Sequence, residues 1–247
     1  MKDSSSYDSK TALQYTSYRP TFHAGILEEC FKGRYDYEMA LDVGCGTGHS
    51  CLALTRFCNH IVGLEPSREM LYQSIAHPKI EYTYYNRQCF QFPDDHFDVI
   101  TFAGSLYYAK SQNLLDEIIR VAKNGAKVIV YDFDILLKST LMDLGFKEES
   151  SEISKYNHQV DFSDLKNDHL RLEGKFDLEL SCATTLPNLA HLLLASRGNY
   201  KQICKSFGSE NVFEALCHKL HDCYESNSRI LSGRGYATNY IMDKNEE

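Results

Sequence analysis

The feature that most constrains the fold of this chain is a glycine-rich turn at residues 44–48, with the sequence Gly-Cys-Gly-Thr-Gly. An apolar run at residues 39–43 precedes the turn and predicts a short buried strand. Residues 49–57 follow with apolar side chains at helical spacing. Glycine tolerates a positive φ and carries no Cβ, and a helix N-terminus presents unpaired N–H groups. The order of strand, glycine turn and helix therefore predicts an α/β domain whose backbone approaches a ligand closely.

The spacing of the glycines separates this turn from two related ones. A dinucleotide-binding turn has the pattern G-x-G-x-x-G, whereas here His49 takes the place of the last glycine, and the Gly-Lys-Ser/Thr of a phosphate-binding loop is absent. A second apolar run, residues 61–64, ends in Glu65, 21 residues after Gly44. An acidic residue at that place accepts hydrogen bonds from ribose hydroxyls. The pattern favours a turn that binds a nucleoside-containing ligand over a tight turn that binds no ligand.

Three segments resemble class I S-adenosylmethionine-dependent methyltransferases. Residues 41–48 (LDVGCGTG) resemble motif I of that family, residues 63–67 (GLEPS) resemble motif II, and residues 97–100 (FDVI) resemble the start of its fourth strand. The resemblance covers residues 39–132. It implies a doubly wound, Rossmann-like α/β sheet that is mostly parallel. The alternation of residues 236–242 predicts an antiparallel C-terminal strand, and the two late helices, at 187–197 and 212–223, predict a helical lid. The resemblance also implies S-adenosyl-L-methionine as the cofactor.

The resemblance implies a set of cofactor-binding residues in the glycine turn, at the ends of the second and fourth strands, in the loop after the third strand and in an N-terminal segment. These residues are Tyr15, Arg19, Asp42, Gly44, Cys45, Gly46, Gly48, Glu65, Pro66, Asn86, Arg87, Gln88, Ala103 and Gly104.

The N-terminal segment has a resemblance of its own. Residues 11–20 contain Tyr-x-x-Tyr-Arg-Pro, which resembles a methyltransferase subgroup that includes trans-aconitate methyltransferase. In that subgroup the segment folds over the cofactor, so Tyr15 and Arg19 would enclose its methionine end. An amphipathic surface helix that ends at Pro20 is the alternative, and both interpretations stay open.

The loop after the third strand departs from the family pattern. Where the family usually carries an acidic residue that contacts the adenine amine, this chain has Asn86, followed by Arg87 and Gln88. An amide oxygen can still accept from that amine. The departure concerns the adenine contacts and leaves the glycine turn and the ribose contact unchanged.

Methyl transfer from a sulfonium needs alignment of the acceptor and exclusion of water, and it needs a base only where the acceptor must lose a proton. The sequence selects no catalytic residue. Tyr107 and Tyr108 follow the fourth strand and could face the acceptor, and ordinary wall packing is the alternative. Arg197 could hold a carboxylate acceptor, as the subgroup resemblance implies. The sequence favours a structural role for His158.

The predicted organisation is a disordered tail at residues 1–10 and a single methyltransferase domain at residues 11–247. The segments of that domain are an N-terminal cap at 11–38, the cofactor-binding core at 39–132, an acceptor-side insertion and lid at 133–235, and a final strand and tail at 236–247. Residues 147–174 within the lid segment are charged and without clear periodicity, and we interpret them as a polar insertion over the site.

Composition limits the partners. The formal net charge is −8, with 26 basic and 34 acidic residues, and this argues against a nucleic-acid partner, because phosphate binding relies on clustered Lys and Arg. We see no signal peptide and no membrane-spanning run. Nine cysteines without a C-x-x-C pair fit neither a disulfide framework nor a metal site. We therefore expect a cytoplasmic protein without metal, as a monomer or weak dimer.

Motifs of other methyltransferases are missing. No D/N-P-P-Y/F/W motif of base-modifying enzymes, no Pro-Cys nucleophile and no two-glutamate loop follows the fourth strand. The predicted function is therefore methyl transfer to a small-molecule acceptor, for which a carboxylate is one candidate. The alternative is a protein of this fold that binds S-adenosylmethionine as a sensor or acts through partners, and a nicotinamide oxidoreductase is a third, more distant one.

Overall fold

The computed structural model describes residues 18–86, 89–146 and 156–244. The chain divides into two compact units, each of which is described by itself. We call the first the core unit; it comprises residues 22–134, 156–178 and 235–247. We call the second the helical unit; it comprises residues 1–21, 135–155 and 179–234. The assignment of residues 11–247 to a single domain stays a prediction.

Helices and strands alternate through the first half of the described chain. In chain order they are α2 (Phe22–Phe31), β1 (Tyr37–Val43), α3 (His49–Leu54), β2 (Cys58–Glu65), α4 (Arg68–Tyr72), β3 (Ile80–Tyr84), β4 (Phe97–Ala103), α5 (Leu106–Ala109), α6 (Gln112–Val121) and β5 (Ala122–Ile135). The remaining elements are α7 (Lys138–Asp143), β6 (Leu170–Thr185), α8 (Leu186–Ala195), α9 (Arg197–Phe207), α10 (Val212–Cys223) and β7 (Ser228–Met242).

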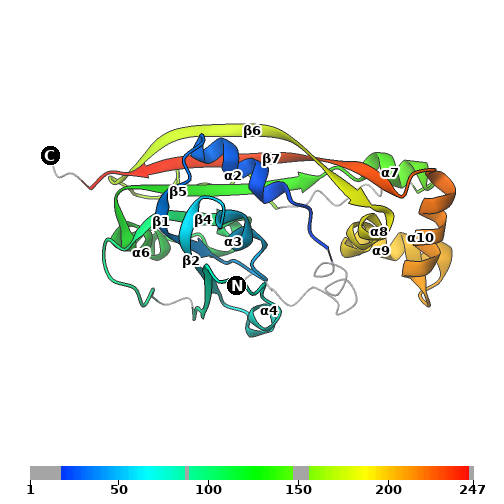
Figure 1. Ribbon diagram of the computed structural model, residues 1–247, viewed down its shortest axis with the longest axis horizontal. Coiled ribbons are helices and arrows are strands. Elements are labelled where there is room, and N and C mark those ends of the chain that lie inside the picture. The colour runs from blue at the N-terminus through cyan, green and yellow to red at the C-terminus, as the bar shows by residue number, and fades with distance from the viewer. Residues whose placement is uncertain (1–17, 87–88, 147–155, 245–247) are drawn as a thin grey trace. The chain divides into compact units, whose positions relative to one another are not determined.

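In the described part of the chain, seven strands form one sheet in the order β3-β2-β1-β4-β5-β7-β6. The pairs β1/β2, β1/β4, β2/β3 and β4/β5 are parallel. The last strand, β7, lies between β5 and β6 and runs against them (Figure 1). Accordingly, Lys244 after β7 donates its backbone N–H to Asn124 near the start of β5, at 2.9 Å. The predicted doubly wound sheet with an antiparallel C-terminal strand is confirmed.

The central strands are apolar because helices cover both faces of a parallel sheet. On β1, residues 40–43 are buried, and Leu41 and Val43 belong to the main hydrophobic cluster of the core unit. Helix α6 contributes four buried residues to this unit: Leu114, Leu115, Ile118 and Val121. Its cap is Ser111, whose hydroxyl accepts from the N–H of Leu114 at 3.2 Å. Strands and helices predicted from periodicity at these places are confirmed.

The start of β5 differs from the sequence prediction. Asn124-Gly125 predicts the end of the preceding helix, but α6 ends at Val121 and the strand begins at Ala122. Gly125 has a φ of +79° inside the strand. The partners of Phe97 and Val99 are Ala122 and Lys127, so β5 carries extra residues there. Glycine permits this bulge because it has no Cβ to clash at positive φ.

Two further expectations were wrong. Helix α4 buries none of its residues, and Met70 is 37% exposed, although its apolar spacing predicts a buried face. The predicted polar insertion at 147–174 overlaps a strand, since β6 begins at Leu170. Exposed and half-buried positions alternate along β6, as expected of an edge strand with charged side chains on its solvent face. Residues 147–155 of the insertion lie outside the described residues.

The helical unit contains α7 to α10. Helix α8 begins at the capping residue Thr185, whose hydroxyl accepts from the N–H of Asn188 at 3.3 Å, and Pro187 occupies its first turn. The sequence predicts helices at 187–197 and 212–223 and assigns no element between them, where the structure has α9. The role of these helices as a lid over the acceptor stays a prediction.

No helix among the described residues is both long and apolar enough to cross a membrane.

Candidate functional site

The glycine turn stands at the carboxyl ends of β1 and β2. The N–H groups of Gly44 and Cys45 both donate to the carbonyl of Leu64, at 2.7 and 3.0 Å, and this fixes the turn to the end of β2. Gly44, Gly46 and Gly48 have φ values of +74°, +58° and +90°. Side chains other than glycine rarely adopt such values, so the sequence pattern G-x-G-x-G follows from the backbone path.

Protein atoms lie against two of the three glycines. A Cβ on Gly44 would stand 2.5 Å from the Cβ of Ser105, and one on Gly48 would stand 2.7 Å from Cζ of Tyr82. A Cβ on Gly46 would have only Sδ of Met70 within 4 Å, at 3.5 Å. Gly44 and Gly48 are therefore required for packing, and Gly46 is the glycine with the most space beside it.

Glu65 lies beside this turn, at the end of β2. Its side chain is 7% exposed. Oε2 accepts from the N–H of Gly46 and Oε1 accepts from the N–H of Ser67, both at 2.9 Å. These bonds fix the carboxylate next to the glycine with the most space. A carboxylate has about four lone-pair positions, so it can hold backbone amides and a diol together.

The side chain of Asp42 points into the protein core and does not face the space beside the glycine turn, although the resemblance implies a cofactor-binding residue at this position. It is fully buried, and it accepts hydrogen bonds from Ser50 and Cys51 of α3 and from Thr101 of β4. Burial raises the pKa of its carboxyl, and the three bonds act against this rise. Its carboxylate thus ties the start of α3 and strand β4 to β1, behind the glycine turn.

Thr101→Val tests the contribution of these hydrogen bonds to stability. The valine keeps the shape but leaves Oδ1 of Asp42 without the 2.7 Å bond that Thr101 donates. An unsatisfied buried acceptor costs about 1–3 kcal/mol, and urea unfolding should show a loss of that size. Thr83→Val on the half-buried edge strand β3 is the matched control, with an expected change under about 0.5 kcal/mol. Equal stability of the two variants would contradict this role for Asp42.

The other implied residues of the turn region lie as follows. Cys45 is buried, and its Sγ packs 2.8 Å from where a Cβ on Gly63 would be, so its side chain faces the protein. Pro66 is half-buried and precedes Ser67, whose hydroxyl caps α4 by accepting from the N–H of Met70 at 3.3 Å. Asn86 follows β3 and is exposed. Tyr15, Arg87 and Gln88 lie outside the described residues.

Ala103 ends β4 and Gly104 follows it, next to the glycine turn. Ser105 follows them and donates its hydroxyl to the carbonyl of Val43, which joins the ends of β4 and β1. The carbonyl of Gly104 accepts from the hydroxyl of Tyr156 at 2.9 Å. Tyr107 is half-buried in α5 and Tyr108 is 64% exposed. Arg19 and Arg197 belong to the helical unit, and Arg197 is exposed.

The structure brings together three side chains that the sequence does not predict as site residues: Asp132, Tyr156 and His158. Asp132, near the end of β5, has Oδ2 at 2.7 Å from the hydroxyl of Tyr156 and at 3.0 Å from Nδ1 of His158. The sequence favours a structural role for His158, whereas the structure places it beside a carboxylate at the carboxyl end of a central strand. The sequence feature that could have indicated this group is Asp132, an acidic residue that follows an apolar run at the sheet edge where ligands bind.

Comparisons with known proteins agree with this architecture. Residues 41–130 match a family model described as methyltransferase domain. A demethylmenaquinone methyltransferase from Clavibacter sepedonicus is 30% identical over 101 residues, which are 39% of this chain and 41% of that protein. The chain spans 39–47% of the length of three curated relatives that it matches.

Two solved structures share the fold. A candidate type II methyltransferase from Anaeromyxobacter dehalogenans has a TM-score of 0.58 and 18% identity, and the match covers 91% of this chain and 97% of that one. The [4+2]-cyclase SpnF has a TM-score of 0.51 and 18% identity, and the match covers 90% of this chain and 81% of that one. At this identity the likeness shows the fold and not the reaction.

Proposed function

We propose, from the premise that residues 41–130 form a class I S-adenosylmethionine-dependent methyltransferase domain, that this protein transfers a methyl group from S-adenosyl-L-methionine to a small-molecule acceptor. The observation that carries the proposal is the pairing of Glu65 with Gly46. A nearly buried carboxylate, held by two backbone N–H groups, lies beside the glycine that has space next to it.

The residues of this site fit the cofactor. The carboxylate of Glu65 would hold the ribose hydroxyls, because a fixed acceptor suits a vicinal diol. The backbone of residues 44–48 would pass the methionine part, together with Ala103 and Gly104 at the end of β4. Asn86 would accept from the adenine amine. When bound, S-adenosylmethionine supplies an activated methyl group on a sulfonium.

The protein then has to align the methyl acceptor with the sulfonium and to exclude water from the site. Tyr107 and Tyr108 would form part of the wall on the acceptor side, since they follow the end of β4 directly. For the acceptor we propose a small molecule. A carboxylate is one candidate, and an acceptor of the kind named in the demethylmenaquinone methyltransferase above is another.

Two measurements test this function. Isothermal titration with S-adenosylmethionine should give saturable one-to-one binding to the purified chain. Incubation with labelled S-adenosylmethionine and a metabolite extract, followed by mass spectrometry, should then show a product heavier by one methyl group. Absence of binding would overturn the assignment of cofactor and activity together.

A second candidate is a protein that binds S-adenosylmethionine without transferring its methyl group. One observation favours it: Asn86 stands in the place of the acidic residue that the family usually carries. Saturable binding with no methylated product in any extract fraction would select this second candidate over the first.

A further inference from the structure

The strongest unassigned feature of the core unit is the group formed by Asp132, Tyr156 and His158, which we call the Asp132 cluster. It lies at the carboxyl ends of β4 and β5. The hydroxyl of Tyr156 joins it to the carbonyl of Gly104, at 2.9 Å, and a Cβ on Gly104 would stand 3.1 Å from Oδ1 of Asp132. Ser105 next to Gly104 packs on Gly44, so the cluster adjoins the glycine turn.

The bond between Asp132 and His158 defines the chemistry of the imidazole. Asp132 engages Nδ1, so Nε2 is the ring nitrogen that remains for an acceptor. The side chains are 17% and 34% exposed, which makes the pair accessible but partly desolvated. The pKa of His158 is raised by its hydrogen bond to Asp132, against partial burial, and Asp134 adds to the rise.

Aromatic rings surround this imidazole. Tyr156 lies 4.8 Å from His158 and 4.6 Å from Tyr107 between ring centroids. Tyr236 of β7 also stacks on His158, at 5.9 Å with an interplanar angle of 27°. Tyr108 lies 5.8 Å from Tyr156. Such surfaces suit a flat aromatic ligand, because offset and edge-to-face ring pairs are favourable.

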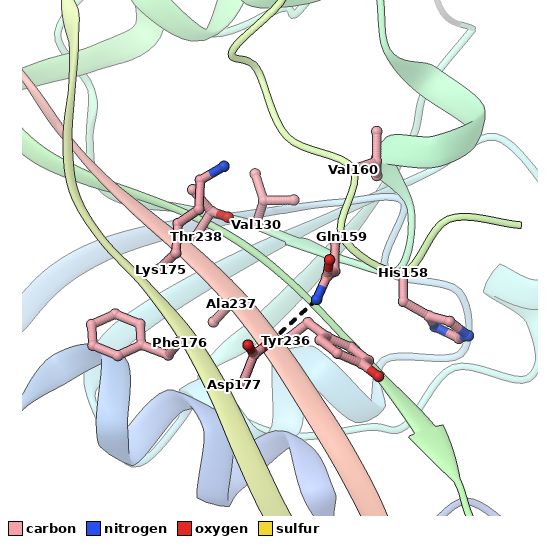
Figure 2. Close-up of a pocket in the computed structure, with 10 residues that line it drawn as sticks. All are labelled: Val130, His158, Gln159, Val160, Lys175, Phe176, Asp177, Tyr236, Ala237 and Thr238. Carbon is pink, nitrogen blue, oxygen red and sulfur yellow. Dashed lines mark hydrogen bonds between the residues drawn. The ribbon is translucent and has the colours of Figure 1, made fainter.

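A pocket of about 200 Å³ includes His158 and Tyr236 in its lining (Figure 2). His158 and Tyr236 stand at one side of it, and Val130, Val160, Phe176 and Ala237 give it apolar walls. Gln159 closes toward Asp177 with a 3.3 Å hydrogen bond. Its volume is below the roughly 300–1,000 Å³ usual for drug-sized ligands, so it suits a single ring or a substituent.

We propose that His158 is the general base for an acceptor with an aromatic hydroxyl group, and that Asp132 is the residue that positions it. This inference rests on the proposed methyl transfer. The O–H bond of the acceptor breaks, its electron pair stays on oxygen, and the proton forms a bond to Nε2 of His158. The products of this step are a phenolate, which is the nucleophile, and an imidazolium ion that Asp132 stabilises.

The presence of a base distinguishes acceptor classes. A carboxylic acid with a pKa near about 4 is already ionised at neutral pH and needs no base, whereas a phenol with a pKa of about 10 must lose its proton. The Asp132 cluster therefore favours an aromatic hydroxyl over the carboxylate that the sequence offers as a candidate.

The pH dependence follows from the surroundings of the imidazole. The titratable side chains around His158 are Asp132 and Asp134 of β5, Tyr156 of its own segment, Lys175 and Asp177 of β6, and Tyr236 of β7. Only the neutral imidazole accepts a proton. Because the carboxylates raise the pKa, proton abstraction should increase as the pH rises through a value above the ordinary one for histidine, and Asp132→Asn should lower that value.

The test uses 4-nitrophenol as the probe, because its phenolate absorbs at a longer wavelength than the neutral phenol. In a pH series that spans the raised pKa of His158, the phenolate band of the probe bound to the wild-type chain should appear at a lower pH than the band of the free probe. We expect His158→Gln to remove that shift of the phenolate band and Asp132→Asn to reduce it, while His169→Gln, in the same segment, leaves it unchanged. Far-ultraviolet circular dichroism checks the fold of each variant, and Tyr156→Phe provides a second, milder change.

Binding of 4-nitrophenol as the neutral phenol, failure to bind, or an undiminished shift of the phenolate band in His158→Gln would each overturn the proposal. The measurement does not require S-adenosylmethionine. Failure of cofactor binding would therefore count against the proposed function alone. With a methylated phenolic product in hand, His158→Gln should lower kcat about 100-fold and leave the affinity for S-adenosylmethionine unchanged.

Discussion

Replacing Glu65 with alanine is expected to lower the affinity for S-adenosylmethionine by about 10²–10⁴-fold. The carboxylate would accept two hydrogen bonds from the ribose, and bonds to a charged group contribute about 1.5–3 kcal/mol each, or about 3–6 kcal/mol together. The alanine also releases the N–H groups of Gly46 and Ser67, which Glu65 now holds at 2.9 Å. Isothermal titration measures the loss.

Two further variants separate loss of the ribose contact from a general loss of structure at the site. Glu65→Gln keeps one acceptor oxygen and the side-chain shape, so its affinity should lie between those of the wild type and the alanine variant. Glu69→Ala, four residues later, removes an exposed carboxylate that accepts from Ser67, and it should change the affinity less than twofold. Binding by Glu65→Ala within fivefold of the wild type would remove Glu65 from the cofactor site.

Gly48→Ala is expected to destabilise the protein by about 2–5 kcal/mol. Gly48 has a φ of +90°, and a left-handed conformation costs a residue with a Cβ about 1–2 kcal/mol. The new Cβ would also stand 2.7 Å from Cζ of Tyr82, with the hydroxyl of that tyrosine closer still. Overpacking of this kind adds about 1–3 kcal/mol. Urea unfolding gives the free energy of each variant.

Gly33→Ala is the matched control, because it isolates the backbone cost. Gly33 has a φ of +80°, and a Cβ there would meet no atom within 4 Å, so only about 1–2 kcal/mol should be lost. In a double variant, Tyr82→Leu should recover part of the stability that Gly48→Ala removes, as a coupling energy between the two sites. Equal losses in Gly48→Ala and Gly33→Ala would contradict the steric argument.

The central strands could be predicted because their sequence signal is local and strong. Residues 39–43 (apart from Asp42) and 61–64 lack charged side chains and are bounded by glycine or by charge, as buried parallel strands require. Prediction was weaker where packing opposes the local signal. Helix α4 has apolar spacing, yet Met70 stays 37% exposed, and Asn124-Gly125 forms a bulge in β5 instead of a helix cap.

The sequence by itself determined the glycine turn, because positive φ values favour glycine, and it placed an acidic residue, Glu65, at the end of β2. The resemblance of these segments to a family added the cofactor. Only the tertiary structure decided that the carboxylate of Asp42 points into the core and that Asp132 meets Tyr156 and His158. These last contacts join residues 24 and 26 positions apart. No periodicity in the chain encodes these contacts, since they depend on where the fold places residues 156 and 158 beside the end of β5.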